Sequence, residues 1–307
     1  MTLEQLTIAS PTSANINVYL AIPEEVPQGL VHVNHGLAEH AKRYTPFLRA
    51  LSSAGFVAIA HDHRGHGMTT APDALLGQFG KKHGARFVIE DMFAVHDKLA
   101  KRWPNLPTVV FGHSAGGLIA LNYALCFPDR VQGLAVWNSP TEPGFLGRVG
   151  KAVLALEGGI KGTAAPSGII PKLSFEAYNY KFRPNRTDFD WLSRDEAAVD
   201  AYAADPLCGF SPSISMWKDV LKLSFACDGF QKFRADLPIH LLAGAEDPTT
   251  EGGRMTKSLV KRMSKAGLTN IDINILPDMR HESLNEVGKD EVIESFITWV
   301  KKVVKHP

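Results

Sequence analysis

A serine flanked by glycines is the first feature of this sequence that could do chemistry. Residues 112–116 form GHSAG, which fits the pattern G-x-S-x-G, with a strand-like stretch before it and an apolar, helix-like stretch after it. A strand that turns abruptly into a helix strains the backbone at the bend, and the neighbours two positions away must lack side chains. The bend would project the Ser114 hydroxyl clear of the sheet, beside amides that favour a developing oxyanion. We therefore predict that Ser114 is a nucleophile.

A nucleophilic serine needs a histidine base, which follows it along the chain in sheets of this kind. Three histidines follow Ser114. His306 is next to the last residue, and His240 falls inside an expected strand, where a buried structural role is more natural. His281 follows the strand-like stretch 270–278, on a loop at the same edge of the sheet as Ser114. We predict that His281 is the base.

The base needs an acid to orient it, and this acid is expected at the end of the preceding strand. The strand-like stretch 237–247 closes with Glu246 and Asp247. We choose Asp247, at the entry to the loop, and keep Glu246 as the alternative. Asp247 would hold the neutral tautomer of His281 and stabilise its cation in the transition state.

An acyl-transfer site also needs two backbone N–H groups aimed at the developing oxyanion. One is the amide of Ala115, directly after the nucleophile. The other is expected on a loop after an earlier strand. There, Gly36 lets the backbone come close, so that the amide of Leu37 can point inward.

The elements that must position these residues alternate between strand-like and helix-like patterns. Strands are expected at 6–10, 16–22, 29–36, 56–63, 108–114, 133–139, 237–247 and 270–278. Helices are expected at 43–55, 85–103, 115–127, 213–226, 252–267 and over most of 283–304. Short, apolar strands that alternate with helices predict an α/β fold, with a mostly parallel sheet and helices on both faces.

The alternation breaks between residues 140 and 212, which are rich in turns and lack a clear strand. We expect residues 1–139 and 213–307 to form one α/β core and residues 140–212 to form an insertion. Helical spacing relates Phe145, Val149, Val153, Leu156 and Ile160, with Arg148, Lys151 and Lys161 nearby. Two interpretations stay open: a lid helix that lies on lipid aggregates or lines an acyl tunnel, and simple packing against the core.

Taken together, these stretches resemble the α/β-hydrolases, and more narrowly the monoacylglycerol lipase and lysophospholipase-like family. The resemblance is carried by HGLAEHAKRY (35–44), DHRGHG (62–67), GHSAGG (112–117), DPL (205–207), GAED (244–247) and RHESLNE (280–286), in the family's order. It implies the triad Ser114, Asp247 and His281. It implies that the amides of Leu37 and Ala115 form the oxyanion hole, and that the insertion is a cap over an acyl pocket.

Two positions depart from the family's pattern. The residue after the nucleophile is often methionine and is Ala115 here, and the second donor position often holds a smaller residue and is Leu37 here. Because only the backbone amides act as donors, we expect the shape of the pocket to differ rather than the chemistry.

The resemblance implies a serine hydrolase that cleaves carboxylic esters through an acyl-enzyme. The expected substrate is a monoacylglycerol, a lysophospholipid or a related small-molecule ester, with transient contact between the cap and lipid surfaces. A small-ester carboxylesterase and an acyltransferase on the same triad are the alternatives, and an aminopeptidase or a non-catalytic binding protein is less favoured. Serine at position 114 excludes dehalogenases and epoxide hydrolases, which use aspartate there, and no cofactor is needed.

A metal site is the main rival signal, in HDHRGH at residues 61–66. His61 and His63 fall on one side of a strand, but the hydrolase pattern H-x-H-x-D-H would need aspartate where Gly65 stands. We therefore expect a structural loop below the nucleophile and no metal. GHSAGG also lacks the Gly-Lys-Ser/Thr ending of a phosphate-binding loop.

The bulk composition argues against several other classes of protein. The 307 residues include 33 basic and 32 acidic side chains, and this balance favours neither nucleic acid nor an anionic membrane as a partner. The three cysteines are too few and too far apart for a disulfide framework, and we expect Cys208 to be buried and inert. The first residues lack the regions of a secretory signal, and no apolar run approaches a membrane span, so we expect a cytoplasmic protein.

Overall fold

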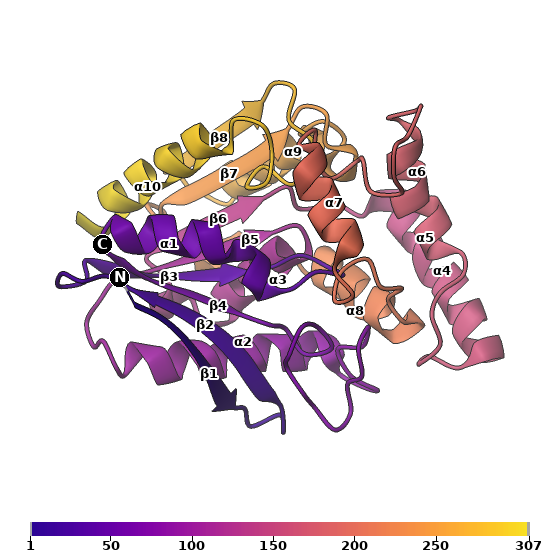
Figure 1. Ribbon diagram of the computed structural model, residues 1–307, viewed down its shortest axis with the longest axis horizontal. Coiled ribbons are helices and arrows are strands. Elements are labelled where there is room, and N and C mark those ends of the chain that lie inside the picture. The colour runs from indigo at the N-terminus through magenta and orange to yellow at the C-terminus, as the bar shows by residue number, and fades with distance from the viewer. Residues whose placement is uncertain (1, 306–307) are drawn as a thin grey trace.

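Eight strands form a single sheet in the computed structural model, which describes residues 2–305 (Figure 1). They are β1 (Thr2–Ala9), β2 (Asn15–Ile22), β3 (Gly29–Asn34), β4 (Phe56–His61), β5 (Thr108–His113), β6 (Gly133–Trp137), β7 (Ile239–Gly244) and β8 (Ile271–Leu276). Their order is β1-β2-β4-β3-β5-β6-β7-β8. The pairs β1–β2 and β2–β4 are antiparallel and every other pair is parallel, which confirms the predicted mostly parallel sheet.

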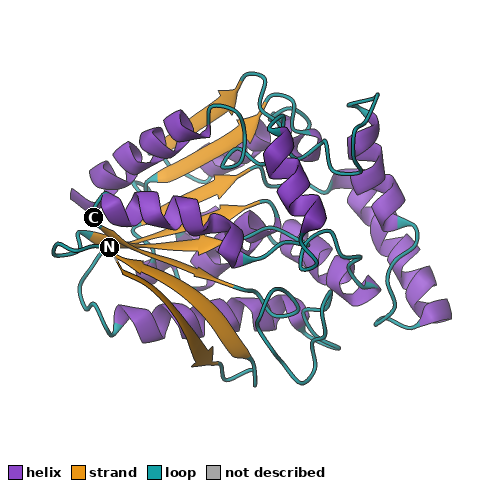
Figure 2. Cartoon of the chain, viewed as in Figure 1, coloured by secondary structure: helices purple, strands orange, loops and turns teal. Residues whose placement is uncertain are grey.

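Helices cover both faces of the sheet (Figure 2). The core helices are α1 (Thr45–Ser53), α2 (Gly84–Ala100), α3 (Ala115–Cys126), α8 (Ile214–Phe225), α9 (Arg254–Lys265) and α10 (Lys289–Lys305). Because side chains alternate along a strand, Val109 and Phe111 of β5 pack with α1 and α10, whereas Val110 packs with α2, α3, α8 and α9. This two-sided burial explains why the central strands are almost wholly apolar.

Residues 140–212 contribute no strand to the sheet. Their helices are α4 (Gly144–Lys161), α5 (Ile170–Leu173), α6 (Phe175–Tyr180) and α7 (Glu196–Ala204). Figure 1 shows these helices beyond the carboxyl ends of the parallel strands. Leu154 of α4 packs with Ile214 and Trp217 of α8, so an apolar cluster joins this segment to the core.

The outer face of α4 is exposed, which bears on the interpretation that its apolar residues pack against the core. Phe145, Leu156 and Ile160 have 74%, 66% and 75% of their surface exposed, whereas Leu154 is fully buried. The interpretation of simple packing against the core is therefore wrong for Phe145, Leu156 and Ile160, whereas Val153 packs beside Leu154. Within residues 2–305, none of the helices is both long enough and apolar enough to cross a bilayer.

Several predicted boundaries shift by a few residues. Helical structure was expected over most of 283–304, and α10 begins at Lys289, after Gly288 in a left-handed conformation with φ of +87°. The preceding loop is held by the carboxylate of Glu286, which accepts hydrogen bonds from the backbone amides of Arg194 and Arg280. Short 3₁₀ helices fill other connections, at η1 (Ala41–Tyr44), η2 (Pro128–Arg130), η3 (Phe230–Lys232) and η4 (Pro248–Thr250).

Candidate active site

Ser114 lies at the sharp turn from β5 into α3 that its sequence predicts. Its φ of 54° and ψ of −122° fall in a region that residues with side chains rarely adopt. A Cβ atom on Gly112 would lie 2.1 Å from the Gly116 carbonyl oxygen, and one on Gly116 would lie 2.2 Å from the Asn34 carbonyl oxygen. The two glycines are therefore required by close backbone contact, as the sequence pattern implies.

His281 and Asp247 come together as predicted. The Nδ1 atom of His281 lies 3.0 Å from Oδ1 of Asp247, and both side chains are buried. Burial acts to raise the pKa of the Asp247 carboxyl, but the charge of His281 and the hydrogen bonds that the carboxylate accepts hold that pKa below its ordinary value. Asp247 is therefore held as a carboxylate.

Three further residues, which the sequence analysis did not single out, surround the Asp247 carboxylate. Asn138 donates through its side-chain amide at 3.0 Å, Thr250 donates through its hydroxyl at 3.0 Å, and Thr249 donates through both its backbone amide and its hydroxyl at 2.9 Å. Ser283 in turn donates to the side-chain oxygen of Asn138 at 3.0 Å, which orients the amide. A sequence signal was present, since Asn138 lies near the end of the expected strand 133–139 and the threonines directly follow Asp247-Pro248.

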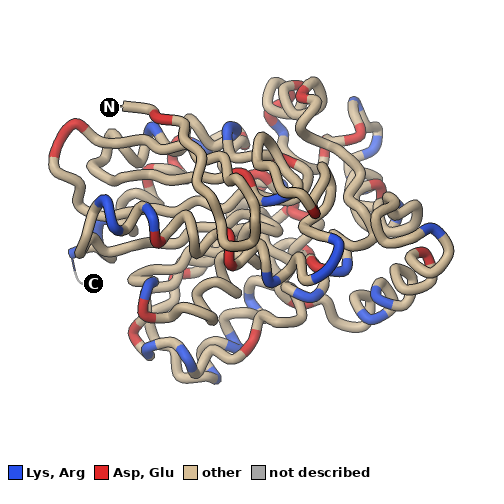
Figure 3. Tube along the Cα trace, turned by 90° about the horizontal axis from the view of Figure 1, so that it is seen from below, with Lys and Arg blue, Asp and Glu red and all other residues tan. Residues whose placement is uncertain are grey.

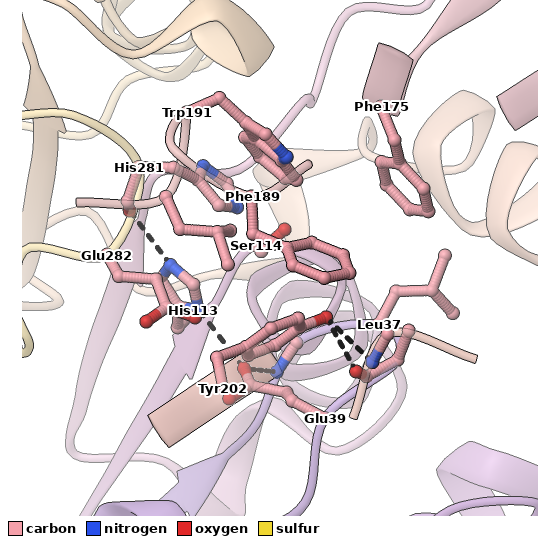
Figure 4. Close-up of a pocket in the computed structure, with 14 residues that line it drawn as sticks. Leu37, Glu39, His113, Ser114, Phe175, Phe189, Trp191, Tyr202, His281 and Glu282 are labelled. Carbon is pink, nitrogen blue, oxygen red and sulfur yellow. Dashed lines mark hydrogen bonds and ion pairs between the residues drawn. The ribbon is translucent and has the colours of Figure 1, made fainter. Parts of the chain in front are cut away.

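Ser114 and His281 line one small pocket of about 50 Å³ (Figure 4). The other lining residues are Gly36, Leu37, Ala38, Glu39, His113, Phe175, Phe189, Trp191, Leu192, Tyr202, Gly209 and Glu282. No hydrogen bond joins the Ser114 hydroxyl to the His281 ring within residues 2–305. Such contacts are often long before substrate binds, and the half-buried Ser114 faces the same space as the ring.

The two predicted oxyanion donors keep their amides free. Within residues 2–305, neither the Leu37 nor the Ala115 backbone N–H donates a hydrogen bond. Gly36 brings the first of these loops close, because a Cβ atom there would lie 2.7 Å from a carboxylate oxygen of Glu39 and 3.3 Å from Cβ of Ser114. Unused N–H groups beside a nucleophile are what an oxyanion hole requires.

A buried ionic network connects the Leu37 loop with the His281 loop. The guanidinium of Arg43 donates to both carboxylate oxygens of Glu282 at 2.7 Å and also to Glu39. Burial acts to lower the pKa of Arg43, but these two carboxylates raise it well above its ordinary value. Arg43 and Glu282 are 239 residues apart in the sequence. The sequence motifs that contain them were recognised separately, and their contact was not predicted.

His113, beside the nucleophile, extends this network to the backbone of His281. Its Nε2 atom lies 3.0 Å from the His281 carbonyl oxygen, and its Nδ1 atom lies 3.1 Å from the Tyr44 hydroxyl and 3.4 Å from Glu39. Burial acts to lower the pKa of His113, but Glu39 raises it above its ordinary value. His113 is thus a positioning residue that the sequence pattern left unassigned.

The remaining candidates lie elsewhere. Glu246, the alternative acid, is exposed and forms no hydrogen bond with His281 within the described part of the chain. His240 is buried and accepts a hydrogen bond from the Trp137 indole at 2.9 Å, in the structural role expected for it. His306 lies outside the described residues.

The histidines of the stretch at 61–66 pack against other rings in the interior. His61 lies 2.9 Å from a ring nitrogen of His32, and the ring centroids of His63 and His35 are 4.2 Å apart. Within residues 2–305, one different group has metal-ligand spacing, with ligand atoms of His40, Asp205 and Cys208 within 4.8 Å of one another.

The chemistry of this group disfavours a metal. His40 already lies 2.9 Å from the Asp205 carboxylate, at hydrogen-bond distance. Burial raises the pKa of the Cys208 thiol well above its ordinary value, and so opposes the thiolate that a metal would need. Cys208 is buried, as expected.

The fold and this pocket define an α/β-hydrolase, and a family model agrees over most of the chain. The Hydrolase_4 family, described as "Serine aminopeptidase, S33", matches residues 25–288, and the chain belongs to this family. Within it, the chain is similar to the monoacylglycerol lipase of Mycolicibacterium smegmatis, with 27% identity over 283 residues that cover 91% of this chain and 90% of that protein. The predicted resemblance to monoacylglycerol lipase-like hydrolases is confirmed.

A human protein and a solved bacterial structure are also similar to this chain. The human monoglyceride lipase is 29% identical over 190 residues, which cover 60% of this chain and 54% of that protein. Among solved structures, a thermostable carboxyl esterase from Bacillus coagulans has a TM-score of 0.89 and 26% identity, and the comparison covers 99% of both chains.

Proposed function

We propose that this protein hydrolyses carboxylic esters with Ser114 as nucleophile, His281 as general base and acid, and Asp247 as the orienting carboxylate. One observation carries the proposal: Ser114, at a strained bend, lines the same pocket as His281, whose Nδ1 atom lies 3.0 Å from the buried Asp247 carboxylate. The similarity to a monoacylglycerol lipase and to a carboxyl esterase supports the enzyme class, a carboxylic ester hydrolase.

In the first half of the proposed reaction, Ser114 Oγ attacks the ester carbonyl carbon while His281 Nε2 takes the hydroxyl proton. The carbonyl oxygen becomes an oxyanion, which the free amides of Leu37 and Ala115 stabilise. The tetrahedral intermediate then collapses. The bond to the leaving oxygen breaks, His281 gives its proton to that oxygen, and the acyl group stays on Ser114 as an ester.

Water completes the cycle. It attacks the acyl-enzyme while His281 again takes a proton, and the collapse of the second intermediate returns that proton to Ser114 and releases the carboxylic acid. The Asp247 carboxylate stabilises the His281 cation in both halves, and its ionised state is supported by the lowered pKa. These steps need no cofactor.

A monoacylglycerol or lysophospholipid is the substrate class that the surface of α4 supports. Its exposed apolar side chains, Phe145, Leu156 and Ile160, would lie on a lipid aggregate while the nearby lysines stay in water. We propose that residues 140–212 form a cap over the pocket and that this face of α4 makes transient contact with lipid surfaces. Figure 3 shows basic and acidic residues mixed over the described residues, whereas the exposed charges of α4 itself, on Arg148, Lys151 and Lys161, are all basic.

A labelling experiment tests the nucleophile. A fluorophosphonate probe should form a covalent adduct with the folded wild-type protein and not with Ser114→Ala, because the probe reacts with an activated serine. The two proteins should have the same circular dichroism spectrum. A wild-type protein that stays unlabelled, or a Ser114→Ala variant labelled to the same extent, would contradict the mechanism.

A small-ester carboxylesterase is the second candidate, favoured by the pocket volume of about 50 Å³. Hydrolysis of p-nitrophenyl esters of increasing acyl length separates the two. We expect kcat/KM to increase beyond eight carbons, because a long chain would bury more apolar surface under the cap. A sharp maximum at about two to four carbons would replace the lipid substrate with a small ester.

Addition of an alcohol acceptor, followed by product analysis, detects acyl transfer in the same assay.

A further inference from the structure

Trp191 packs against the ring of His281 from the loop between α6 and α7. The two ring centroids are 4.9 Å apart with an angle of 34° between the rings, and Phe175 stacks on the indole at 5.7 Å and 15°. The backbone amide of Trp191 donates to the side chain of Asn179 at 3.0 Å, and the next carbonyl, of Leu192, accepts a hydrogen bond from the amide after His281 at 2.7 Å. The position of the indole beside the candidate base is therefore well determined.

The indole N–H of Trp191 has no acceptor within residues 2–305, although it is buried. Figure 4 shows this nitrogen on the side of the indole away from His281, toward Phe175. The neighbouring polar groups of the pocket already have partners: the Tyr202 hydroxyl donates to the Ala38 carbonyl at 2.8 Å, and Glu282 binds Arg43. A buried donor without an acceptor costs free energy, which a ligand oxygen would recover.

The direction of the proposed reaction indicates which part of a substrate can reach this donor. The carbonyl oxygen must lie at the amides of Leu37 and Ala115, and the leaving oxygen must lie at His281 to receive its proton. Trp191 contacts His281, so it borders the leaving alcohol. In a glycerol ester, a free hydroxyl stands one or two carbons beyond the leaving oxygen, within reach of a neighbouring donor.

We propose that Trp191 is a specificity-determining residue whose indole N–H donates a hydrogen bond to a free hydroxyl of the leaving alcohol. The enzyme then prefers esters of polyols such as glycerol to esters of simple alcohols with the same acyl group. This inference rests on the proposed ester hydrolysis and adds the recognition of the alcohol to it.

Trp217 provides a matched control. Its indole N–H is also buried and without an acceptor in the described part of the chain. However, it packs in the apolar cluster with Leu154, Ile170 and Ile214 and is not among the residues that line the pocket. Phenylalanine in place of either tryptophan removes the N–H and keeps an aromatic ring.

The test measures kcat/KM for 1-monodecanoylglycerol and for ethyl decanoate with wild type, Trp191→Phe and Trp217→Phe. For Trp191→Phe, the ratio of the glycerol ester to the ethyl ester should fall about tenfold, the effect of losing one neutral hydrogen bond. For Trp217→Phe, the ratio should stay within about twofold of wild type. Because both substrates are measured on one preparation, any unfolded fraction cancels in the ratio.

Four results would contradict these proposals, and each has a different meaning. Equal losses on both esters for Trp191→Phe would mean that the ring only positions His281. Equal loss of the ratio in both variants would mean that neither N–H acts on the alcohol specifically. A wild-type protein that cleaves neither ester would overturn the proposed hydrolysis itself, whereas a wild type that cleaves ethyl decanoate without preferring the glycerol ester would overturn this inference alone.

Discussion

The buried Asp247 carboxylate accepts hydrogen bonds from several residues. Donors reach it from Asn138, Thr249 and Thr250, in addition to His281. Burial opposes its charge, and these contacts more than offset that effect, so its pKa stays low. A buried carboxylate beside the base can hold one imidazole tautomer and stabilise the cation that forms during acyl transfer.

Replacing this carboxylate by an amide tests its role with little change in shape. We expect Asp247→Asn to lower kcat by about 10³–10⁴, because the wrong histidine tautomer would face Ser114. Glu246→Gln is the control, since Glu246 is the exposed neighbour, and it should change kcat less than twofold. The reverse order of effects would make Glu246 the orienting acid. Ester hydrolysis by both purified variants provides the measurement.

At the scale of elements, the turn between β5 and α3 is tightly constrained by backbone contacts. The first turn of α3 approaches the end of β3 so closely that a Cβ atom on Gly116 would overlap the Asn34 carbonyl oxygen at 2.2 Å. By contrast, Gly159 on the exposed side of α4 has no neighbour within 4 Å of its Cβ position. The same substitution should therefore have opposite effects at these two sites.

We expect Gly116→Ala to lower the free energy of unfolding by about 3 kcal/mol or more, because backbone rather than a flexible side chain must move. Gly159→Ala should raise it by about 0.5–1 kcal/mol, because glycine weakens a helix relative to alanine. Urea unfolding of the two variants measures both changes. A Gly116→Ala protein as stable as wild type would show that the bend relaxes more freely than its contacts indicate.

At the scale of the whole molecule, the core contains an unusual number of histidines. Rings of His32, His35, His61, His63, His66 and His96 are all buried, and neighbouring centroids lie as close as 4.2 Å. Burial lowers the pKa of His35 and His96 to about 4 and that of His61 and His66 to about 3. Burial also lowers the pKa of His240 to about 4.

These values predict a strong dependence of stability on pH. Well above pH 6.5 these five histidines are neutral in both the folded and unfolded states, so their contribution to stability is complete. As the pH falls from 6.5 toward 4, the unfolded chain binds protons that the folded chain does not. Each of the five histidines whose pKa falls to about 3 or 4 then costs about 1.4 kcal/mol per pH unit. Since domains are stable by about 5–15 kcal/mol, we expect cooperative unfolding between pH 6 and 4.

Urea unfolding at pH 7.5, 6.5 and 5.5 measures this slope. The free energy of unfolding should fall by about 2 kcal/mol between the first two values and by about 5 kcal/mol more at the third. His83 is exposed, so His83→Ala should leave the slope unchanged. Constant stability from pH 7.5 to 5.5 would contradict the assignment of neutral, buried rings.

Local patterns by themselves determined much of the fold and the identity of the candidate residues. Apolar runs and helical spacing located all eight strands and the core helices, because each pattern reports the backbone geometry of its own segment. Ser114 could be found because its bend needs small neighbours nearby in sequence, and His281 and Asp247 could be found because parallel strands end at one edge of the sheet. The first and last residues of helices and strands were predicted less accurately, as at Lys289 at the start of α10. Contacts with side chains of other segments determine where these elements begin and end.

Only the tertiary structure decided which distant side chains meet. Arg43 pairs with Glu282 across 239 residues, Asn138 reaches Asp247 across 109, and Trp191 lies on His281. The sequence also did not predict that the outer face of α4 is exposed. An apolar stripe on a helix is buried only if other segments of the chain pack beside it. Sequence patterns report the preferences of a segment, whereas contacts between segments depend on how the whole chain packs.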